Sequence, residues 1–120
     1  MIMKKEKVIL DFGDNKKVEF EAQICDNVFS QARGLMFRSR RSSPALAFRF
    51  KRDVKEPIHS FFVFFPFVAA WLDSDGKIIR IQTVWPFLPY AVPEKKFRTL
   101  VEIPINSKNR KILDDIEKFK

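Results

Sequence analysis

The chain of 120 residues contains very little cysteine, histidine or glycine, and each shortage excludes a class of function. Its single cysteine, Cys25, cannot form an internal disulfide, so nothing in the fold requires an oxidising compartment and we expect a cytoplasmic protein. One cysteine and one histidine cannot supply a zinc site, and we expect neither a metal nor another cofactor. Three isolated glycines do not form the clustered loop that nucleotide phosphates require.

Long hydrophobic segments are also missing. The N-terminal stretch MIMKKEK lacks the apolar core of a signal peptide, so we expect none. The longest apolar run, Phe61–Leu72, has twelve residues and is interrupted by Pro66. A membrane span needs roughly 18 to 20 apolar residues, so we expect no span and interpret this run as buried strand. Its continuous character predicts that Phe62, Phe64, Val68 or Ala70, and Leu72 belong to the core.

Phenylalanine and positive charge, by contrast, are abundant. Fourteen Phe residues indicate a well-filled core or an exposed apolar surface. The net charge of +8 arises mainly from residues 27–59, which carry eight Lys or Arg against two acids. The segment 33–55 is therefore a candidate polyanion-binding surface for nucleic acid or anionic lipid, although thermophile-like Lys and Arg enrichment gives the same charge, and nucleic acid is not the favoured partner. Arg38 in this segment is a candidate anion ligand, although an arginine near a helix C-terminus is also stabilised by the helix dipole alone.

Alternating and continuous apolar segments predict a mostly β fold. Turn residues at 13–15 and 74–76 predict two hairpins, and Asn106 is a candidate helix N-cap. The predicted helices are Asn27–Met36 and a short one after Asn106 that ends near Leu113. The predicted loops are Lys51–Glu56 and Trp85–Lys96. The predicted strands are Lys7–Phe12, Lys16–Ile24, Ala45–Phe50, Ile58–Phe64, Ala69–Asp73, Lys77–Val84, Thr99–Ile103 and Asp114–Phe119. With no repeat or linker, residues 1–120 are expected to form a single-domain β-sandwich or partly closed barrel of about seven strands with two short helices.

Two groups of residues are candidates for a functional site. The only histidine, His59, would serve a hydrolase-like enzyme if a carboxylate such as Asp73 or Glu102 lay beside it, although a lone histidine at the start of a strand is more often structural. Three prolines stiffen the loop Trp85–Lys96, where Trp85, Phe87 and Tyr90 would line an aromatic groove or fold inward as a lid.

The segment Arg33-Gly34-Leu35-Met36 resembles the signature of the domain of unknown function 192 family, also called uncharacterised protein family 0127. The resemblance extends over roughly 20–119. The other positions that carry it are Pro66, Asp73, Gly76, Glu102 and Pro104. It implies a compact β-sandwich-like fold and no established activity. Within the motif we expect Gly34 at the end of the first helix and Leu35 and Met36 in the core.

The chain departs from the family pattern at several polar positions. Many members carry a Trp-Met-Lys-Asn-Thr run where this chain has residues 59–63, and an Asp where it has Val68. A site built from those polar residues would be absent or rebuilt here. The function is therefore unknown, and our best hypothesis is a non-catalytic binding module with an aromatic groove for a protein or a small apolar ligand.

Overall fold

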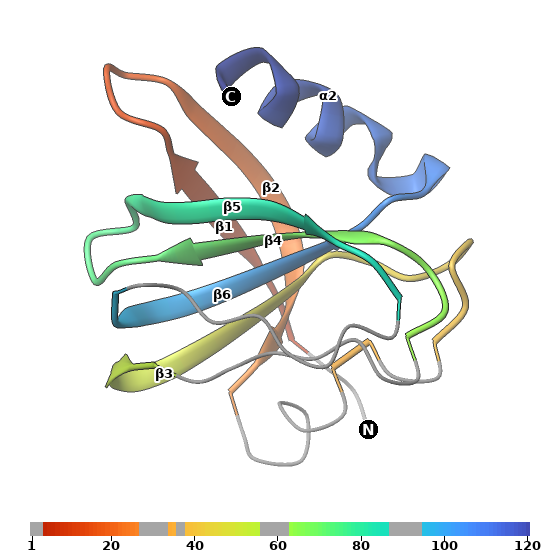
Figure 1. Ribbon diagram of the computed structural model, residues 1–120, viewed down its shortest axis with the longest axis horizontal. Helices are drawn as coiled ribbons and strands as arrows, with labels where there is room; N and C mark the ends of the chain where they lie inside the picture. The colour runs from red at the N-terminus through yellow and green to blue at the C-terminus, as the bar shows by residue number, and fades with distance from the viewer. Residues whose placement is uncertain (1–3, 27–33, 36–37, 56–62, 87–94) are drawn as a thin grey trace.

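The computed structural model describes residues 4–26, 34–35, 38–55, 63–86 and 95–120, and these form one six-stranded sheet (Figure 1). The strands are β1 (Lys5–Asp11), β2 (Lys17–Cys25), β3 (Leu46–Val54), β4 (Phe67–Leu72), β5 (Ile78–Val84) and β6 (Phe97–Pro104). Their order is β1-β2-β3-β6-β4-β5, and β2 and β3 are the one parallel pair among them. The predicted mostly β class is confirmed, with six described strands in place of about seven.

Both predicted hairpins are confirmed, and their turns show why these residues are needed. Gly13, Asp14 and Asn15 all have positive φ, a region that glycine, asparagine and aspartate enter more easily than other residues. In the β4–β5 turn, Asp73 Oδ1 accepts hydrogen bonds from the backbone N–H groups of Asp75 (2.8 Å) and Lys77 (3.0 Å). Asp73 therefore has a structural role in this turn.

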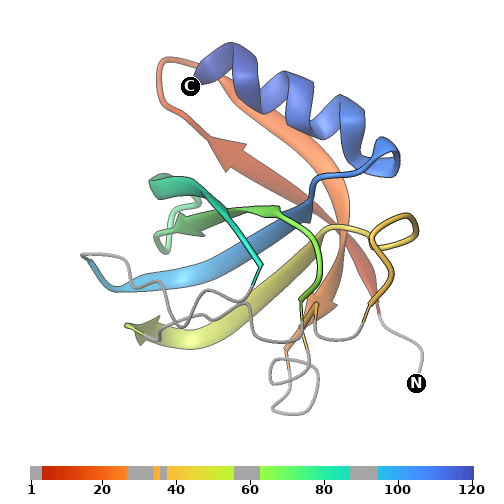
Figure 2. The same ribbon diagram turned by 45° about the vertical axis from the view of Figure 1, so that its right-hand side comes forward.

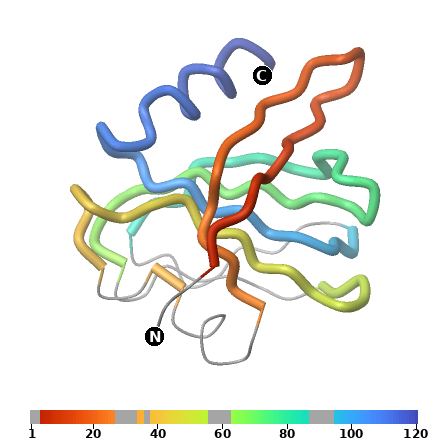
Figure 3. The backbone as a smooth tube through the Cα atoms, turned by 180° about the vertical axis from the view of Figure 1, so that it is seen from behind, coloured from red at the N-terminus to blue at the C-terminus, as the bar shows by residue number. Residues whose placement is uncertain are grey.

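The sheet curls until its two outer strands meet at one point. The Asp11 N–H donates to the Gly76 carbonyl at 3.3 Å, and Asp11 forms an isolated parallel bridge with Lys77. Seen from behind, the β1–β2 hairpin crosses the other strands steeply (Figure 3). The partly closed barrel predicted from the pattern is thus confirmed, because the end of β1 reaches the β4–β5 turn while β1 and β5 share no ladder among the described residues.

Buried side chains lie on both faces of the sheet. We call the inner cluster the concave core; its buried members are Val8, Leu10, Val18, Phe20, Ala22, Ile24, Ala45, Ala47, Val68, Ala70, Leu72, Val101, Ile103 and Ile116. We call the opposite cluster the outer core; it comprises Cys25, Leu35, Leu46, Phe48, Val63, Phe65, Phe67, Ala69, Trp71, Val84, Phe97 and Leu100. Strand β4 contributes to both clusters, which explains its uninterrupted apolar sequence.

A C-terminal helix covers the open side of the concave core. Asn106 Oδ1 accepts the Asn109 N–H at 2.9 Å and so caps a 3₁₀ turn, η1 (Ser107–Asn109), which leads into α2 (Arg110–Phe119). Ile112, Leu113, Ile116 and Phe119 recur at helical spacing and pack on this core, and α2 lies over β2 (Figure 2). The cap prediction is confirmed, whereas the predicted strand Asp114–Phe119 is wrong. Among the described residues, no helix is long and apolar enough to cross a membrane.

Other boundaries differ from the sequence prediction. Lys51–Val54 continue β3, although their charge suggested a loop, because Lys51, Arg52 and Asp53 at this end of the strand are all exposed to solvent. Val63 and Phe64 are not in a strand, and the side chain of Phe64 is 59% exposed, so its assignment to the core is wrong. Val68, Ala70 and Leu72 are buried as predicted. The helix predicted at 27–36 and Phe62 lie largely outside the described residues.

Candidate functional site

Glu102 is a carboxyl group buried in the middle of the sheet. It lies on β6 between Leu46 of β3 and Ala69 of β4, and only 6% of its surface is exposed. Within the described part of the chain, no side chain forms a hydrogen bond or ion pair with it. Burial without a partner disfavours the charged form and raises the pKa of Glu102 from 4.5 to about 8. At neutral pH this carboxyl group is therefore protonated and can donate a hydrogen bond.

Two further polar atoms on the same face lack partners. Ala69 pairs with Glu102 on one side and with Gln82 of β5 on the other, so these three residues form one row across the sheet. Trp71, two residues along β4, projects from the same face. Among the residues that the structure describes, neither Trp71 Nε1 nor Gln82 Oε1 has a hydrogen-bond partner, and both atoms are buried. The row thus offers an acid, a donor and an acceptor around the small side chain of Ala69.

The Arg-Gly-Leu motif packs against this row. Gly34 has φ +48, and a Cβ atom there would lie 3.2 Å from Phe48 Cζ and 3.7 Å from Glu102 Oε1. Leu35 is buried in the outer core, as predicted. Arg38 Nε donates to the Gly34 carbonyl at 2.9 Å, which fixes the turn. Glycine is favoured at position 34 because both the positive φ and the close approach of Phe48 disfavour a side chain.

Two exposed aromatic residues lie at the end of the β4–β5 hairpin that is remote from its turn. Phe64 precedes β4 and Trp85 follows β5, and their side chains are 59% and 65% exposed. Phe67 and Val84, the last paired residues at this end, are both buried. Trp85 is therefore not a lid on the core. We call Glu102, Trp71, Gln82, Phe64 and Trp85 the Glu102 site.

The structure brings together only part of the site expected from the sequence. His59, Phe87 and Tyr90, with Met36 of the motif, lie outside the described residues, so the groove and the His59 hypothesis stay predictions. Asp73 follows the C-terminal end of β4, where its side chain accepts hydrogen bonds within the β4–β5 turn. No group of three or more His, Cys, Asp or Glu residues that could hold a metal ion occurs within the described ranges.

The remaining motif residues connect neighbouring segments. The Pro66 carbonyl accepts the Ile105 N–H at 3.0 Å, and the Pro104 carbonyl accepts Asn109 Nδ2 at 3.0 Å. Gly76 has φ +86 and supplies the carbonyl that binds Asp11. In the basic segment, Arg40 Nε donates to the Ile105 carbonyl at 2.9 Å. Arg38 and Arg40 thus each bind a backbone carbonyl of the protein itself.

Sequence reasoning missed Trp71 and Gln82 as site residues and treated Glu102 mainly as a motif position. The available signal was the single acidic residue inside the apolar strand 97–104, because a carboxyl group in a central strand is rare without a role. Gln82 gave no such signal, since a polar residue in a hairpin strand is ordinary.

Comparison with known proteins agrees with the motif and the fold. Residues 9–114 match the model of the family DUF192, described as "Uncharacterized ACR". The chain belongs to this family. A UPF0127 protein of Pyrococcus horikoshii is 27% identical over 97 residues, which cover 81% of this chain and 84% of that protein. A UPF0127 protein of Pyrococcus abyssi is 28% identical over 106 residues, 88% of each chain. The family has no assigned function.

Two solved structures share the DUF192 chain's fold. One, from Sinorhizobium meliloti, is described as a candidate transcription regulator; it has a TM-score of 0.76 and 18% identity, and the match covers 87% of this chain and 83% of that one. The other, a protein of unknown function from Novosphingobium aromaticivorans, has a TM-score of 0.67 and 14% identity, with coverage of 90% and 76%. At these identities the likeness shows the fold alone.

Proposed function

We propose that this DUF192 protein is a non-catalytic binding module, and that its ligand binds at the Glu102 site. The observations that support the proposal are the two exposed rings, Phe64 and Trp85, at one end of the β4–β5 hairpin, and the buried atoms Trp71 Nε1 and Gln82 Oε1 further along the same strands, which lack partners among the described residues. Aromatic rings offer large contact areas at low entropic cost, and buried polar groups without partners favour a ligand that satisfies them.

The chemistry of the row defines the ligand class. Protonated Glu102 and Trp71 Nε1 are donors, and Gln82 Oε1 is an acceptor. A matching ligand has an apolar or aromatic part for the rings and at least one carbonyl oxygen for the donors. Small apolar amides and extended peptides both satisfy this description, in line with the protein or small apolar ligand expected from the sequence.

A thermal-shift screen of small apolar amides and short peptides tests the proposal. Compounds that raise the melting temperature are then titrated against Phe64→Ala, Trp85→Ala and the control Lys111→Ala, which removes a side chain 89% exposed on α2. We expect the first two variants to weaken binding about tenfold or more and the control to bind normally. Equal affinity in all variants would refute this location.

Hydrolase-like catalysis is the second candidate, and the raised pKa of Glu102 favours it. A carboxyl group with a pKa of about 8 can exchange a proton near neutral pH, as a general acid or base does. Hydrolysis of p-nitrophenyl esters, with a pH–rate profile that Glu102→Gln abolishes, would support an enzyme. If the wild-type protein hydrolyses the esters no faster than Glu102→Gln does, the binding module is the better hypothesis.

Nucleic acid is a weaker candidate as a partner. The Sinorhizobium structure's description as a candidate transcription regulator supports it, as does the net charge of +8. Against it, Arg38 and Arg40 already bind backbone carbonyls.

We also infer that residues 1–120 form one domain and that the protein works in the cytoplasm, where a single cysteine stays reduced.

A further inference from the structure

We propose a second binding site on the opposite side of the molecule: the outer edge of β1 binds an extended acidic segment of a partner protein as an added strand. The site consists of the edge residues Lys5, Lys7 and Ile9 and the groove beside them. It shares no residue with the Glu102 site and does not depend on the function proposed there.

The hydrogen-bond pattern of the first hairpin shows which backbone groups face this edge. The Phe12 N–H donates to Lys16, and the Lys4 carbonyl accepts from Ile24, so even-numbered residues of β1 bond to β2. In an antiparallel ladder, the alternate residues direct their N–H and C=O groups outward. Asp11 confirms the alternation, because its N–H points outward to Gly76. Lys5, Lys7 and Ile9 therefore present their backbone groups to the outer edge.

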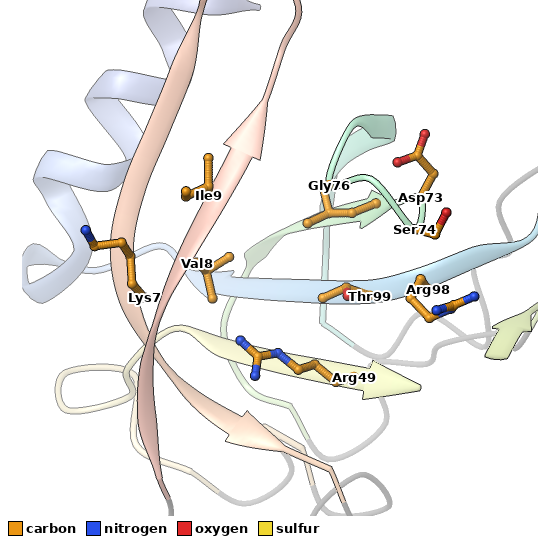
Figure 4. Close-up of a pocket in the computed structure, with 10 residues that line it drawn as sticks. Lys7, Val8, Ile9, Arg49, Asp73, Ser74, Gly76, Arg98 and Thr99 are labelled. Carbon is orange, nitrogen blue, oxygen red and sulfur yellow. The ribbon is translucent and has the colours of Figure 1, made fainter. Parts of the chain in front are cut away.

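Within the described residues, the Asp11 contact is the one backbone hydrogen bond that this edge forms with the β4–β5 turn. Beyond it lies a groove with a volume of about 240 Å³ (Figure 4). Its lining includes Val8 of β1, Arg49 of β3 and Arg98 of β6. An added strand would place alternate side chains in this groove and the others on the solvent side.

The solvent side of β1 indicates an acidic partner. Lys5, Lys7 and Ile9 share this face, and on the β2 side Lys7 pairs with Glu21 in register and contacts Glu19 at 3.6 Å. A strand on the free side would gain the same type of pairing. Opposite charges across strands stabilise a sheet, so acidic residues are favoured opposite the two lysines and a β-branched residue opposite Ile9.

Arg49 adds a cation inside the groove. Its guanidinium points toward β1 (Figure 4) and pairs with Glu6. Both side chains are about two-fifths exposed, and exposed ion pairs contribute little to stability. A carboxylate from a bound strand can therefore share or replace the Glu6 contact. Arg98 also lines the groove, and its pair with Asp53, at 3.0 Å, is similarly exposed.

A second copy of this chain fits the edge poorly. Antiparallel pairing of two β1 edges centred on Lys7 would place one Lys7 opposite the other and leave four lysines on one face. Like charges directly opposite each other destabilise a sheet. Exposed strand edges often carry lysine for this reason, because it discourages self-association while leaving the backbone groups available to an acidic partner.

The test uses fluorescence anisotropy with a labelled peptide in which valine and glutamate alternate over seven residues. We expect saturable binding that falls at least tenfold for the same peptide with glutamine in place of glutamate. The double variant Lys5→Glu/Lys7→Glu should lose binding to the acidic peptide and gain binding to a valine–lysine peptide. The control Lys16→Glu/Lys17→Glu changes the net charge equally at the far end of the hairpin and should bind like wild type.

A backbone variant separates strand addition from charge attraction. Lys7→Pro removes an outward N–H that β2 does not use, so the hairpin should fold while strand addition is blocked. If Lys7→Pro does not fold by circular dichroism, the charge-swap experiment decides alone. The proposal is overturned if the control Lys16→Glu/Lys17→Glu loses as much binding as Lys5→Glu/Lys7→Glu. It is also overturned if duplex DNA of twelve base pairs binds more tightly than the peptide. A dimer in sedimentation that Lys5→Glu/Lys7→Glu dissociates would overturn it in favour of self-association.

Discussion

Gly34 lies so close to the ring of Phe48 that a Cβ atom at position 34 would be 3.2 Å from Phe48 Cζ. The contact joins the family motif to the outer core, beside the Glu102 carboxyl group. It also connects a turn in the first third of the chain to β3, and its disruption should be measurable.

Gly34→Ala should destabilise the protein by more than about 1 kcal/mol, because it adds both a left-handed backbone penalty and a tight contact. Gly13→Ala is the matched control, since Gly13 has φ +86 with nothing within 4 Å of its Cβ position. Urea unfolding of both variants separates strain from crowding. An unchanged free energy of unfolding for Gly34→Ala would contradict both the backbone strain and the Phe48 contact.

Phe64→Ala and Phe65→Ala compare adjacent rings in opposite environments. Phe65 is 1% exposed, so its truncation should cost roughly 3 to 5 kcal/mol. Phe64 is mostly exposed, so its truncation should change the free energy of unfolding by less than about 0.5 kcal/mol. Thermal or urea denaturation checks both values, and a large loss for Phe64→Ala would contradict its exposed position.

Stability should fall as pH rises, because the pKa of Glu102 is raised in the folded protein. Between about pH 4.5 and about 8 the unfolded chain releases the Glu102 proton while the folded protein retains it. The unfolded state then binds fewer protons, so this group lowers the free energy of unfolding by up to about 1.4 kcal/mol per pH unit. Glu102→Gln should remove this slope in urea titrations from pH 5 to 8. An unchanged slope would show that Glu102 does not titrate as inferred.

Asn109→Ala should destabilise the connection between β6 and α2. The buried Asn109 side chain donates to the carbonyls of Pro104 (3.0 Å) and Ser43 (3.2 Å). Truncation leaves the Pro104 carbonyl without this donor, whereas the Ser43 carbonyl still accepts from Asn106 Nδ2 at 2.9 Å, so the expected cost is about 1 to 3 kcal/mol. Lys108→Ala, an exposed neighbour, is the control. Loss of stability in Asn109→Ala alone, by calorimetry, would confirm the role of the amide.

Local turn chemistry made the hairpins and the Asn106 cap predictable, because the residues that adopt positive φ or cap a helix act over three or four positions. The error at Asp114–Phe119 was avoidable, since Ile112, Ile116 and Phe119 follow helical spacing. Phe64 was misplaced because a continuous apolar run hides alternation: Val63, Phe65 and Phe67 are buried, and Phe64 between them is not.

The candidate site was less predictable because it depends on strand order. Glu102 and Gln82 are both neighbours of Ala69 only because β4 lies between β6 and β5, and no local pattern specifies that order. Likewise, the groove beside β1 arises from the curvature of the whole sheet. The charged end of β3 was taken for a loop because its pairing with β6 is distant in sequence and shifts register after Arg49.

The contact between Asp11 and Gly76 closes the barrel across a long stretch of sequence, whereas the β1–β2 hairpin is joined to β3 by a parallel ladder of only three residue pairs. The place of this hairpin in the barrel therefore depends mainly on apolar packing, because Val8, Leu10 and Phe20 lie in the concave core that α2 covers. Breaking the hydrogen bond between Asp11 and Gly76 would separate β1 from the β4–β5 turn and admit water to the concave core. Hydrogen exchange at the Asp11 amide would then report how often the barrel opens.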